Sequence, residues 1–414
     1  MKSPVWHPFT QHGLHEPIPL VEAAEGAALF TADGRRIVDG ISSWWVTTHG
    51  HRHPTIMRAI ADQCERLDQI IFAGWTHEPA ERLAGELLKL MPSGLAHVFY
   101  SDSGSTSVEV ALKMALGYWL NRGEPRHRIV VLEGSYHGDT IGGMSVGARG
   151  VFNQPYAPLL FDVDVIPFPE QGREQETIDA LEHLCRKSSP AALIVEPLVL
   201  GAGGMRIYPA LVLKEMRRLC TSAQILFIAD EVMTGWGRTG TLLACAQAGI
   251  VPDILCLSKG LTGGSLPLAV TLASPAIYDA HYSADRRRQF FHSSSYTANP
   301  IACAAALANL AVWRDEPVNE RIAALEQHQE QRKGRLGKAK NVRRIGTIVA
   351  CELGESNGNY LSTRAPGLLA HFRSRNLLLR PLGNTIYVMP PYCVTPEDIE
   401  RIYGVIVEAA ATRL

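Results

Sequence analysis

The sequence predicts an α/β fold, in which helices cover both faces of a parallel or mixed sheet. Short apolar runs rich in Val, Ile and Leu alternate with helical patterns between about residues 95 and 275. These runs cover residues 96–102, 128–134, 191–197, 224–230, 253–259 and 268–274. Gly, Pro or Asp bounds each run, as is usual for buried strands. Alternation of strands and helices predicts that helices pack on both faces of the sheet.

The C-terminal part has a different pattern and predicts a smaller α+β domain. A charged helix ends near Lys338, strand-like residues follow at 346–353, and another helix lies near 363–375. The last helix has a readable start, with Thr395 as N-cap, Pro396 at N1 and Asp398 at N3. Strand-like residues 27–40 are expected to join this domain. We therefore expect a large domain over 51–312 and a small domain made of 1–50 and 313–414.

Composition argues against several classes of protein. The chain has 414 residues, 40 basic and 41 acidic side chains and a net charge of −1, so nothing suggests a nucleic acid or an anionic membrane as partner. Its 8 cysteines are scattered without a CxxC pair, as reduced core cysteines are. The N-terminus lacks the apolar core of a signal peptide, and no apolar stretch reaches the ~18 residues of a membrane span. We expect a soluble, cytoplasmic protein.

Common nucleotide and metal motifs are absent from the sequence. No G-x-x-x-x-G-K-[ST] motif is present, and "GAGGMR" at 201–206 lacks the third glycine of a dinucleotide fingerprint. The histidines of "HGHRHP" at 49–54 are better explained as loop or core residues than as ligands. We expect no metal site.

The segment at 101–119 is a candidate phosphate site. A strand runs into small polar residues, and a helix follows, with Thr106 and Glu109 as a plausible capping box. Gly104 and Ser105 lie just ahead of the free N–H groups of that helix, which together with the helix dipole attract an anion. Ordinary helix capping would give the same pattern.

Three further side chains follow predicted strands, where ligands bind in such sheets. Tyr136 comes after the second run and could stack on a planar ligand. Asp230 ends another run, where it could be an N-cap, pair with Arg238, or face a protonated ring nitrogen. Lys259 ends the next run and is followed by three glycines within five residues. A phosphate cup, a stacking ring, a carboxylate and an amine together fit one cofactor, pyridoxal phosphate.

The chain resembles the class III (ω-type) pyridoxal-phosphate aminotransferases over nearly its whole length. The segments that carry the resemblance are "WHPFTQ" (6–11), "DGISSWWVTTHGHRHP" (39–54), "YSDSGSTSVEVALKMAL" (100–116), "SYHGDTIGGMSV" (135–146), "IADEVMTGWGRTG" (228–240), "PDILCLSKGLTGG" (252–264), "SYTANPIACAAA" (295–306) and "RPLGNTIYVMPPY" (380–392). The resemblance implies fold type I, with a mostly parallel seven-stranded sheet in the large domain. It also implies a homodimer with shared active sites.

The resemblance assigns the cofactor-binding residues. Lys259 would attach covalently to pyridoxal phosphate and carry the proton during the reaction, and Asp230 would pair with the pyridine nitrogen. Gly104 and Ser105 would bind the phosphate, which Ser294 and Ser295 would reach from the neighbouring subunit. Tyr136 would stack on one face of the ring and Val232 on the other.

The resemblance also implies the substrate site. Trp44, Tyr136 and Ser293 would line it, and Arg380 would bind a carboxylate, although a buried salt bridge is an alternative role for Arg380. Because adjacent side chains often point apart, one of Trp44 and Trp45 is expected to line the pocket. Phe9 belongs to the same site and stands where some relatives carry tyrosine.

"SSWW" and "RPLGNTIYVMPPY" narrow the resemblance to enzymes of biotin biosynthesis. These enzymes aminate 8-amino-7-oxononanoate with S-adenosylmethionine as amino donor, and some relatives use lysine as the donor instead. No residue decides between the two donors. Another ω-aminotransferase, acting on diamines, β-amino acids or ω-amino acids, is the alternative function.

Overall fold

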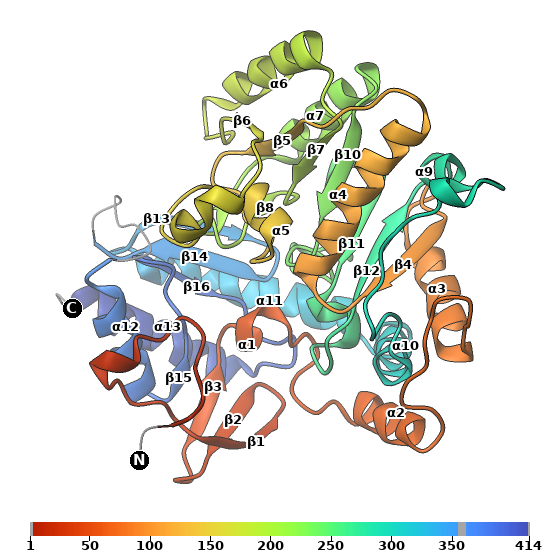
Figure 1. Ribbon diagram of the computed structural model, residues 1–414. Helices are drawn as coiled ribbons and strands as arrows, with labels where there is room; N and C mark the ends of the chain where they lie inside the picture. The colour runs from red at the N-terminus through yellow and green to blue at the C-terminus, as the bar shows by residue number, and fades with distance from the viewer. Residues whose placement is uncertain (1–2, 355–361, 413–414) are drawn as a thin grey trace.

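The computed structural model describes residues 3–354 and 362–412. Its main feature is a seven-stranded sheet with the strand order β4-β12-β11-β10-β7-β5-β6 (Figure 1). The strands are β4 (His97–Ser101), β5 (Ile129–Leu132), β6 (Asp164–Ile166), β7 (Ala192–Val195), β10 (Leu226–Asp230), β11 (Ile254–Leu257) and β12 (Ala269–Ala273). Only β12 runs against its neighbours in this sheet, so the sheet is mostly parallel.

All six predicted runs form strands of this sheet, and the predicted α/β class is confirmed. The strand that the residue pattern missed is β6, which has three residues at the sheet edge. Only Ile166 of its three side chains is buried, so no apolar run marks it.

Helices cover both faces of the sheet, as expected. Side chains alternate along β7, so Ala192 and Ile194 face one side, whereas Leu193 and Val195 face the other. The first side packs on α4 (Gly104–Asn121) and α9 (Pro275–His281). The second packs on α3 (Glu78–Leu90), α6 (Glu174–Ser188), α7 (Ala210–Ser222), α8 (Cys245–Ala248) and α10 (Pro300–Asp315).

Two smaller sheets lie outside the large one, and strands from both ends of the chain share the first of them. One sheet contains β1 (Val21–Glu25), β2 (Ala28–Thr31), β3 (Arg36–Asp39) and β15 (Leu377–Leu378), and the other contains β13 (Lys340–Ile345), β14 (Ile348–Glu352) and β16 (Thr385–Val388). β15 pairs with β3 in parallel, so segments from opposite ends of the chain share a sheet. The helices of this part are α11 (Val318–Lys333), α12 (Ala365–Ser374) and α13 (Pro396–Ala411). The domain boundaries expected from the sequence stay a prediction.

The shorter elements connect these layers. The helices are α1 (Ser42–Trp45), α2 (Pro54–Cys64) and α5 (Ile141–Ser145), and a two-stranded sheet pairs β8 (Val199–Leu200) with β9 (Arg206–Ile207). Short 3-10 turns cover His12–Leu14, Gln154–Leu159, Lys259–Thr262, Arg286–Arg288 and Gly334–Leu336.

The start of α13 agrees with the sequence prediction. The Thr395 side chain accepts a hydrogen bond from the Asp398 N–H, and Pro396 opens the helix. The Asp398 carboxylate receives two hydrogen bonds from Arg36, at 2.8 and 2.7 Å. This pair joins the last helix to the N-terminal sheet.

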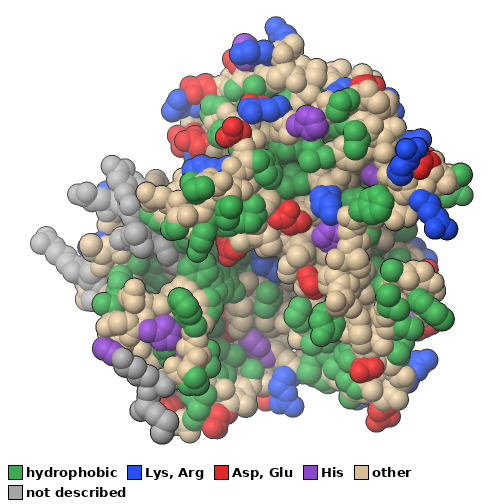
Figure 2. Space-filling model, viewed as in Figure 1, with side chains coloured by type: hydrophobic (Ala, Val, Ile, Leu, Met, Phe, Trp, Pro, Cys, Tyr) green, Lys and Arg blue, Asp and Glu red, His purple; other side chains and the backbone are tan. Residues whose placement is uncertain are grey.

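Charged side chains of both signs are mixed with hydrophobic ones on the face shown in Figure 2. Among the described residues, no helix is long and apolar enough to cross a membrane.

Candidate active site

A cavity of about 180 Å³ lies where β5, β7, β10 and β11 end, beside the start of α4. Six residues expected from the sequence line it: Gly104, Ser105, Tyr136, Asp230, Val232 and Lys259. The remaining lining residues are Trp45, His137, Gly138, Glu196 and Met233. The strand ends therefore bring together side chains that are far apart in the sequence.

The start of α4 differs from the predicted capping box. Ser103 is the N-cap: its side chain accepts from the Thr106 N–H, and the Thr106 side chain accepts from the Ser103 N–H. The pairing of Thr106 with Glu109 is wrong, because the Glu109 carboxylate accepts instead from the Gly142 N–H at 2.7 Å. Gly104 and Ser105 are thus the first two residues of an 18-residue helix. Their N–H groups belong to the turn that has no intrahelical acceptors.

Gly104 allows a close approach that any side chain would prevent. A Cβ at this position would lie 2.6 Å from Cγ1 of Val232. Because Val232 also lines the cavity, the glycine allows the start of α4 to pack closely against this wall of the cavity.

Asp230 is 5% exposed and is held by two neighbours. His137 Nδ1 lies 2.7 Å from Asp230 Oδ2, and the Val232 N–H donates to Asp230 Oδ1 at 3.1 Å. The suggested ion pair with Arg238 does not form. Arg238 is buried and donates to backbone carbonyls of residues 45, 47 and 390, so it orders the surrounding turns.

Lys259 follows β11 and places its amine in the cavity. Its φ of 48° lies in the left-handed region, which is uncommon for a side chain of this size. Burial lowers the pKa of its amine to about 8, while the charges of Asp230 and Glu196 oppose this fall. The amine lies 5.0 Å from the centre of the Trp45 ring. A larger fraction of this amine is neutral at physiological pH than for an exposed lysine.

Tyr136 is half-buried beside Asp230, in the loop that follows β5. Burial raises the pKa of its hydroxyl, and the nearby Asp139 carboxylate adds to the rise. The Tyr136 N–H donates to Glu196 at 2.9 Å.

His137 and Glu196 are the two polar residues of the cavity that sequence reasoning did not assign. His137 adjoins Tyr136 in the same loop, and its Nε2 atom is buried without a hydrogen-bond partner among the described residues. Glu196 directly follows an apolar strand and Asp230 ends one, so the same signal could have found Glu196.

The "SSWW" segment forms a left-handed turn. Ser42, Ser43, Trp44 and Trp45 have φ values of 52°, 45°, 77° and 74°. Left-handed residues cost roughly 1–2 kcal/mol each and are concentrated at functional sites. The turn places Trp45 in the cavity wall, and its Nε1 atom donates to the Tyr387 hydroxyl at 2.9 Å.

Trp44 lies outside this cavity, in a cluster with two other predicted substrate-site residues. Its ring centre is 5.5 Å from that of Phe9 and 5.3 Å from the Arg380 guanidinium. Arg380 also donates to the Phe9 carbonyl at 3.3 Å. Phe9, Trp44 and Arg380 thus lie together, and their role in binding substrate stays a prediction.

Ser293, Ser294 and Ser295 lie in a loop before α10 and do not line the cavity. Ser294 Oγ donates to the carboxylate of Asp102 at 3.2 Å, and Asp102 is two residues ahead of Gly104. Their predicted role toward a neighbouring subunit stays a prediction.

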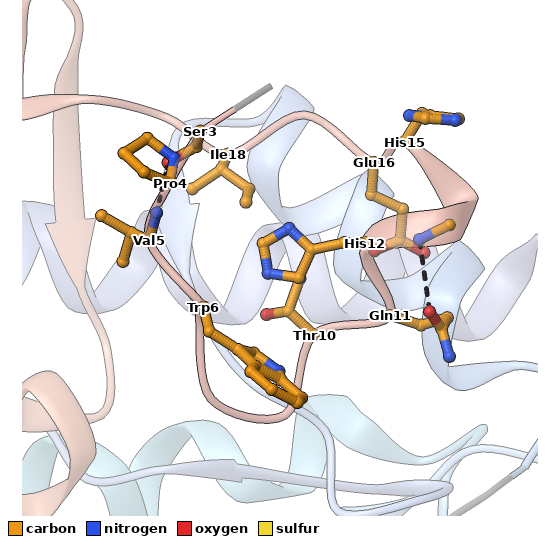
Figure 3. A pocket seen from close by; sticks show the side chains of 11 residues that line it. Ser3, Pro4, Val5, Trp6, Thr10, Gln11, His12, His15, Glu16 and Ile18 are labelled. Atoms are coloured by element: carbon orange, nitrogen blue, oxygen red, sulfur yellow. Dashed lines mark hydrogen bonds between the residues drawn. The ribbon is translucent and has the colours of Figure 1, made fainter. Parts of the chain in front are cut away.

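A larger hollow of about 750 Å³ lies in the N-terminal segment (Figure 3). All its lining residues come from between Ser3 and Ile18. Figure 3 shows two local hydrogen bonds, from the Val5 N–H to Ser3 and from the Gly13 N–H to Gln11. Since this hollow gathers no residues from distant segments, we place the active site at the smaller cavity. Within residues 3–354 and 362–412, no group of three or more acidic, His or Cys side chains is arranged to hold a metal ion.

The residues of the smaller cavity fit pyridoxal phosphate. The free N–H groups of Gly104 and Ser105 suit a phosphate, and Asp230 suits a protonated ring nitrogen. Lys259 supplies an amine of lowered pKa for an aldehyde. Tyr136 and Val232 provide walls for a planar ring.

Comparison with known proteins agrees with this geometry. The family model described as "Aminotransferase class-III" matches residues 10–410. The chain belongs to the class III aminotransferases. Within this family it is 47% identical to the adenosylmethionine-8-amino-7-oxononanoate aminotransferase of Synechococcus elongatus, with 98% of this chain and 97% of the relative covered.

Solved structures of two transaminases superpose on almost the whole chain. The adenosylmethionine-8-amino-7-oxononanoate aminotransferase of Methanocaldococcus jannaschii has a TM-score of 0.94 at 32% identity, covering 99% of this chain and 98% of that one. An amine transaminase from an uncultivated Pseudomonas species, solved in its PLP-bound form, has a TM-score of 0.91 at 31% identity, with the same coverage. The fold type I architecture implied by the resemblance is therefore confirmed.

Proposed function

We propose that this chain is a pyridoxal-phosphate-dependent aminotransferase of biotin biosynthesis. It converts 8-amino-7-oxononanoate to 7,8-diaminononanoate, with S-adenosylmethionine as the amino donor. The observation that carries the proposal is that Lys259 and Asp230, at the ends of adjacent strands, line one cavity with the start of α4. The names of the Synechococcus and Methanocaldococcus relatives support this choice of substrates.

The cofactor, when bound, supplies an aldehyde that accepts an amino group and a ring that withdraws electrons. Asp230 keeps the ring nitrogen protonated, because a carboxylate favours the charged form of a nearby base. The N–H groups of Gly104 and Ser105 bind the phosphate, and Tyr136 and Val232 hold the ring between them. Orientation of this kind lowers the barrier before any bond is broken.

Lys259 is the general base and acid of the transfer. Its Nζ atom would take a proton from the donor carbon that bears the amino group and pass it to the cofactor carbon that carried the aldehyde. With the acceptor bound, it would carry a proton from that cofactor carbon to the acceptor carbon. A pKa of about 8 suits both directions, since the amine gains and loses a proton easily near neutral pH.

Arg380 binds the substrate carboxylate, with Phe9 and Trp44 packing against the substrate chain. A guanidinium can donate two parallel hydrogen bonds to a carboxylate. Ser293 contributes to the same site.

The active enzyme is a homodimer in which Ser294 and Ser295 reach the phosphate bound by the neighbouring subunit. Phe291 and Tyr296 flank these serines and are 63% and 62% exposed. Gln69 donates to the Ser295 carbonyl, so the segment that carries the exposed side chains of Ile71 and Trp75 adjoins the serine loop. Exposed apolar side chains grouped in this way are typical of an interface. The cytoplasmic location expected from the sequence remains a prediction.

A substrate panel with the cofactor-loaded protein tests the proposal. We expect turnover of 8-amino-7-oxononanoate, with S-adenosylmethionine changing the cofactor absorbance in the absence of acceptor. The same titration with lysine decides the amino donor. Activity with 4-aminobutyrate or ornithine, and none with 8-amino-7-oxononanoate, would favour another ω-aminotransferase. As a control for the site itself, Lys259→Ala loses the absorbance near ~420 nm expected of a lysine-bound cofactor and nearly all turnover.

A further inference from the structure

The cavity contains a second buried carboxylate that the proposed reaction does not use. Glu196 is 4% exposed, lines the cavity and directly follows β7. β7 and β10 are parallel neighbours in which Val195 lies opposite Ala229, so Glu196 and Asp230 occupy the next positions of adjacent strands. Because side chains alternate along strands, both carboxylates leave the sheet on the face that carries α4.

Glu196 connects two loops of the cavity wall. One carboxylate oxygen accepts from the Tyr136 N–H at 2.9 Å, and the other accepts from the Gly201 N–H at 2.9 Å. Each oxygen therefore has its own backbone donor. A glutamine side chain of the same shape could satisfy only one of the two N–H groups, because its amide nitrogen cannot accept.

Charged and titratable groups face Glu196 from several elements. Asp230 lies on β10, His137 and Tyr136 lie in the loop after β5, and Lys259 follows β11, while the Tyr208 hydroxyl donates to the Glu196 carbonyl. Burial raises the pKa of the Glu196 carboxyl to about 7, the His137 side chain lowers it and the Asp230 charge raises it further. The charge of Glu196 also raises the pKa of Lys259.

We propose that Glu196 is a positioning residue for the aminotransferase reaction, which fixes Tyr136 at the cavity wall and places a second carboxylate in the cavity that holds the amine of Lys259. This inference rests on the proposed function, because it assigns a role toward the bound cofactor. The site would then contain two carboxylates with different roles. Asp230 pairs with the ring nitrogen of the cofactor, whereas Glu196 acts on Tyr136 and Lys259.

Glu231 provides a matched control for Glu196. It is fully buried, its two carboxylate oxygens accept from the N–H groups of Ala244 and Cys245 at 2.6 and 2.8 Å, and burial raises its pKa. It follows Asp230 directly, so it points to the opposite face of the sheet and does not line the cavity. Loss of a buried carboxylate is therefore similar at both positions, whereas nearness to the cofactor differs.

The experiment compares Glu196→Gln with Glu231→Gln in cofactor-loaded protein. We expect Glu196→Gln to raise the dissociation constant of pyridoxal phosphate about tenfold. The pH midpoint of the cofactor absorbance change should fall by about one unit, because a negative charge near Lys259 is lost. Glu231→Gln should leave both values as in the wild type. An unchanged midpoint in Glu196→Gln, or an equal shift in Glu231→Gln, overturns the proposal.

Glu196→Asp keeps the test decisive if Glu196→Gln does not fold, as judged by thermal unfolding of the cofactor-free protein. The shorter aspartate retains the charge but not both backbone hydrogen bonds. It should weaken cofactor binding and leave the midpoint unchanged, whereas unchanged binding overturns the positioning role. A wild-type protein that binds the cofactor but transaminates neither proposed substrate refutes the proposed function instead, and the binding and midpoint comparison remains valid.

Discussion

His137 Nδ1 lies 2.7 Å from the Oδ2 atom of Asp230, and both side chains are buried. The loop after β5 supplies the histidine and the end of β10 supplies the aspartate. Asp230 is therefore held in place by the sheet on one side and by a loop on the other. Cofactor binding should depend on this pair.

Replacement of His137 by phenylalanine tests that dependence. We expect a roughly 10–100-fold loss of affinity for pyridoxal phosphate, because a hydrogen bond to a charged group contributes about 1.5–3 kcal/mol. Equilibrium dialysis measures the affinity. His137→Asn retains a hydrogen-bond donor and should keep more of the affinity for pyridoxal phosphate than His137→Phe does. Unchanged cofactor binding in His137→Phe would show that Asp230 needs no hydrogen-bond partner at this position.

Lys259 should make the stability of the cofactor-free protein dependent on pH. Its pKa is lowered from 10.5 in the unfolded chain to about 8 in the folded one. Between these two pH values the unfolded state binds more protons, so the free energy of unfolding rises with pH from about 8 to 10.5. This contribution to stability is fully present above pH 10.5, and it is gone once the pH has fallen through about 8.

Lys259→Met removes this pH dependence. At pH 7 we expect the variant to be more stable than the wild type by up to about 3 kcal/mol, and the difference should shrink above pH 8. Urea denaturation of both cofactor-free proteins at several pH values measures it. A difference independent of pH would contradict the lowered pKa.

Gly104→Ala should damage the phosphate site. The new Cβ would lie 2.6 Å from Cγ1 of Val232, and a β-branched side chain has little freedom to move away. We expect at least a tenfold loss of cofactor affinity, since either the helix start or the ring wall must shift. Gly85→Ala in α3 is the control, because a Cβ there meets nothing within 4 Å and should stabilise the helix. Equal cofactor binding by both variants would argue against this packing.

Arg380→Met should affect the substrate and spare the cofactor. We expect KM for 8-amino-7-oxononanoate to rise at least tenfold, because a charge-assisted contact to its carboxylate is lost. The dissociation constant of pyridoxal phosphate should stay unchanged. Arg373→Met is a matched control, since Arg373 lines the same hollow as Arg380 but donates to the Pro17 carbonyl. An unchanged KM in Arg380→Met would show that another residue binds the substrate carboxylate.

The sequence by itself determined the class of the fold and the positions of six strands. Apolar runs of this length report burial directly, and the residue that follows each run marks the edge where ligands bind. Asp230, Lys259 and Tyr136 could therefore be named without coordinates. The helix over residues 396–411 could also be placed, because Thr395 and Pro396 act within one turn.

Only the tertiary structure decided which groups meet. The partner of Asp230 is His137 and not Arg238, although Arg238 is much nearer in the sequence. The order of the strands in the sheet brings the loop after β5, which carries His137, close to the end of β10. This order is set by the packing of the whole sheet. A local pattern contains no information on it.

The tertiary structure also decides which of Trp44 and Trp45 lines the cavity and which residue caps α4. Four consecutive left-handed residues direct Trp45 to Lys259 and Trp44 to Arg380, and the surrounding contacts hold this turn, which propensity disfavours. Ser103 and not Thr106 is the N-cap, and the Glu109 carboxylate instead accepts from the Gly142 N–H of another segment. Sequence marks where chemistry can occur, and three-dimensional packing selects the partner of each group, because contacts between distant segments outweigh local preference.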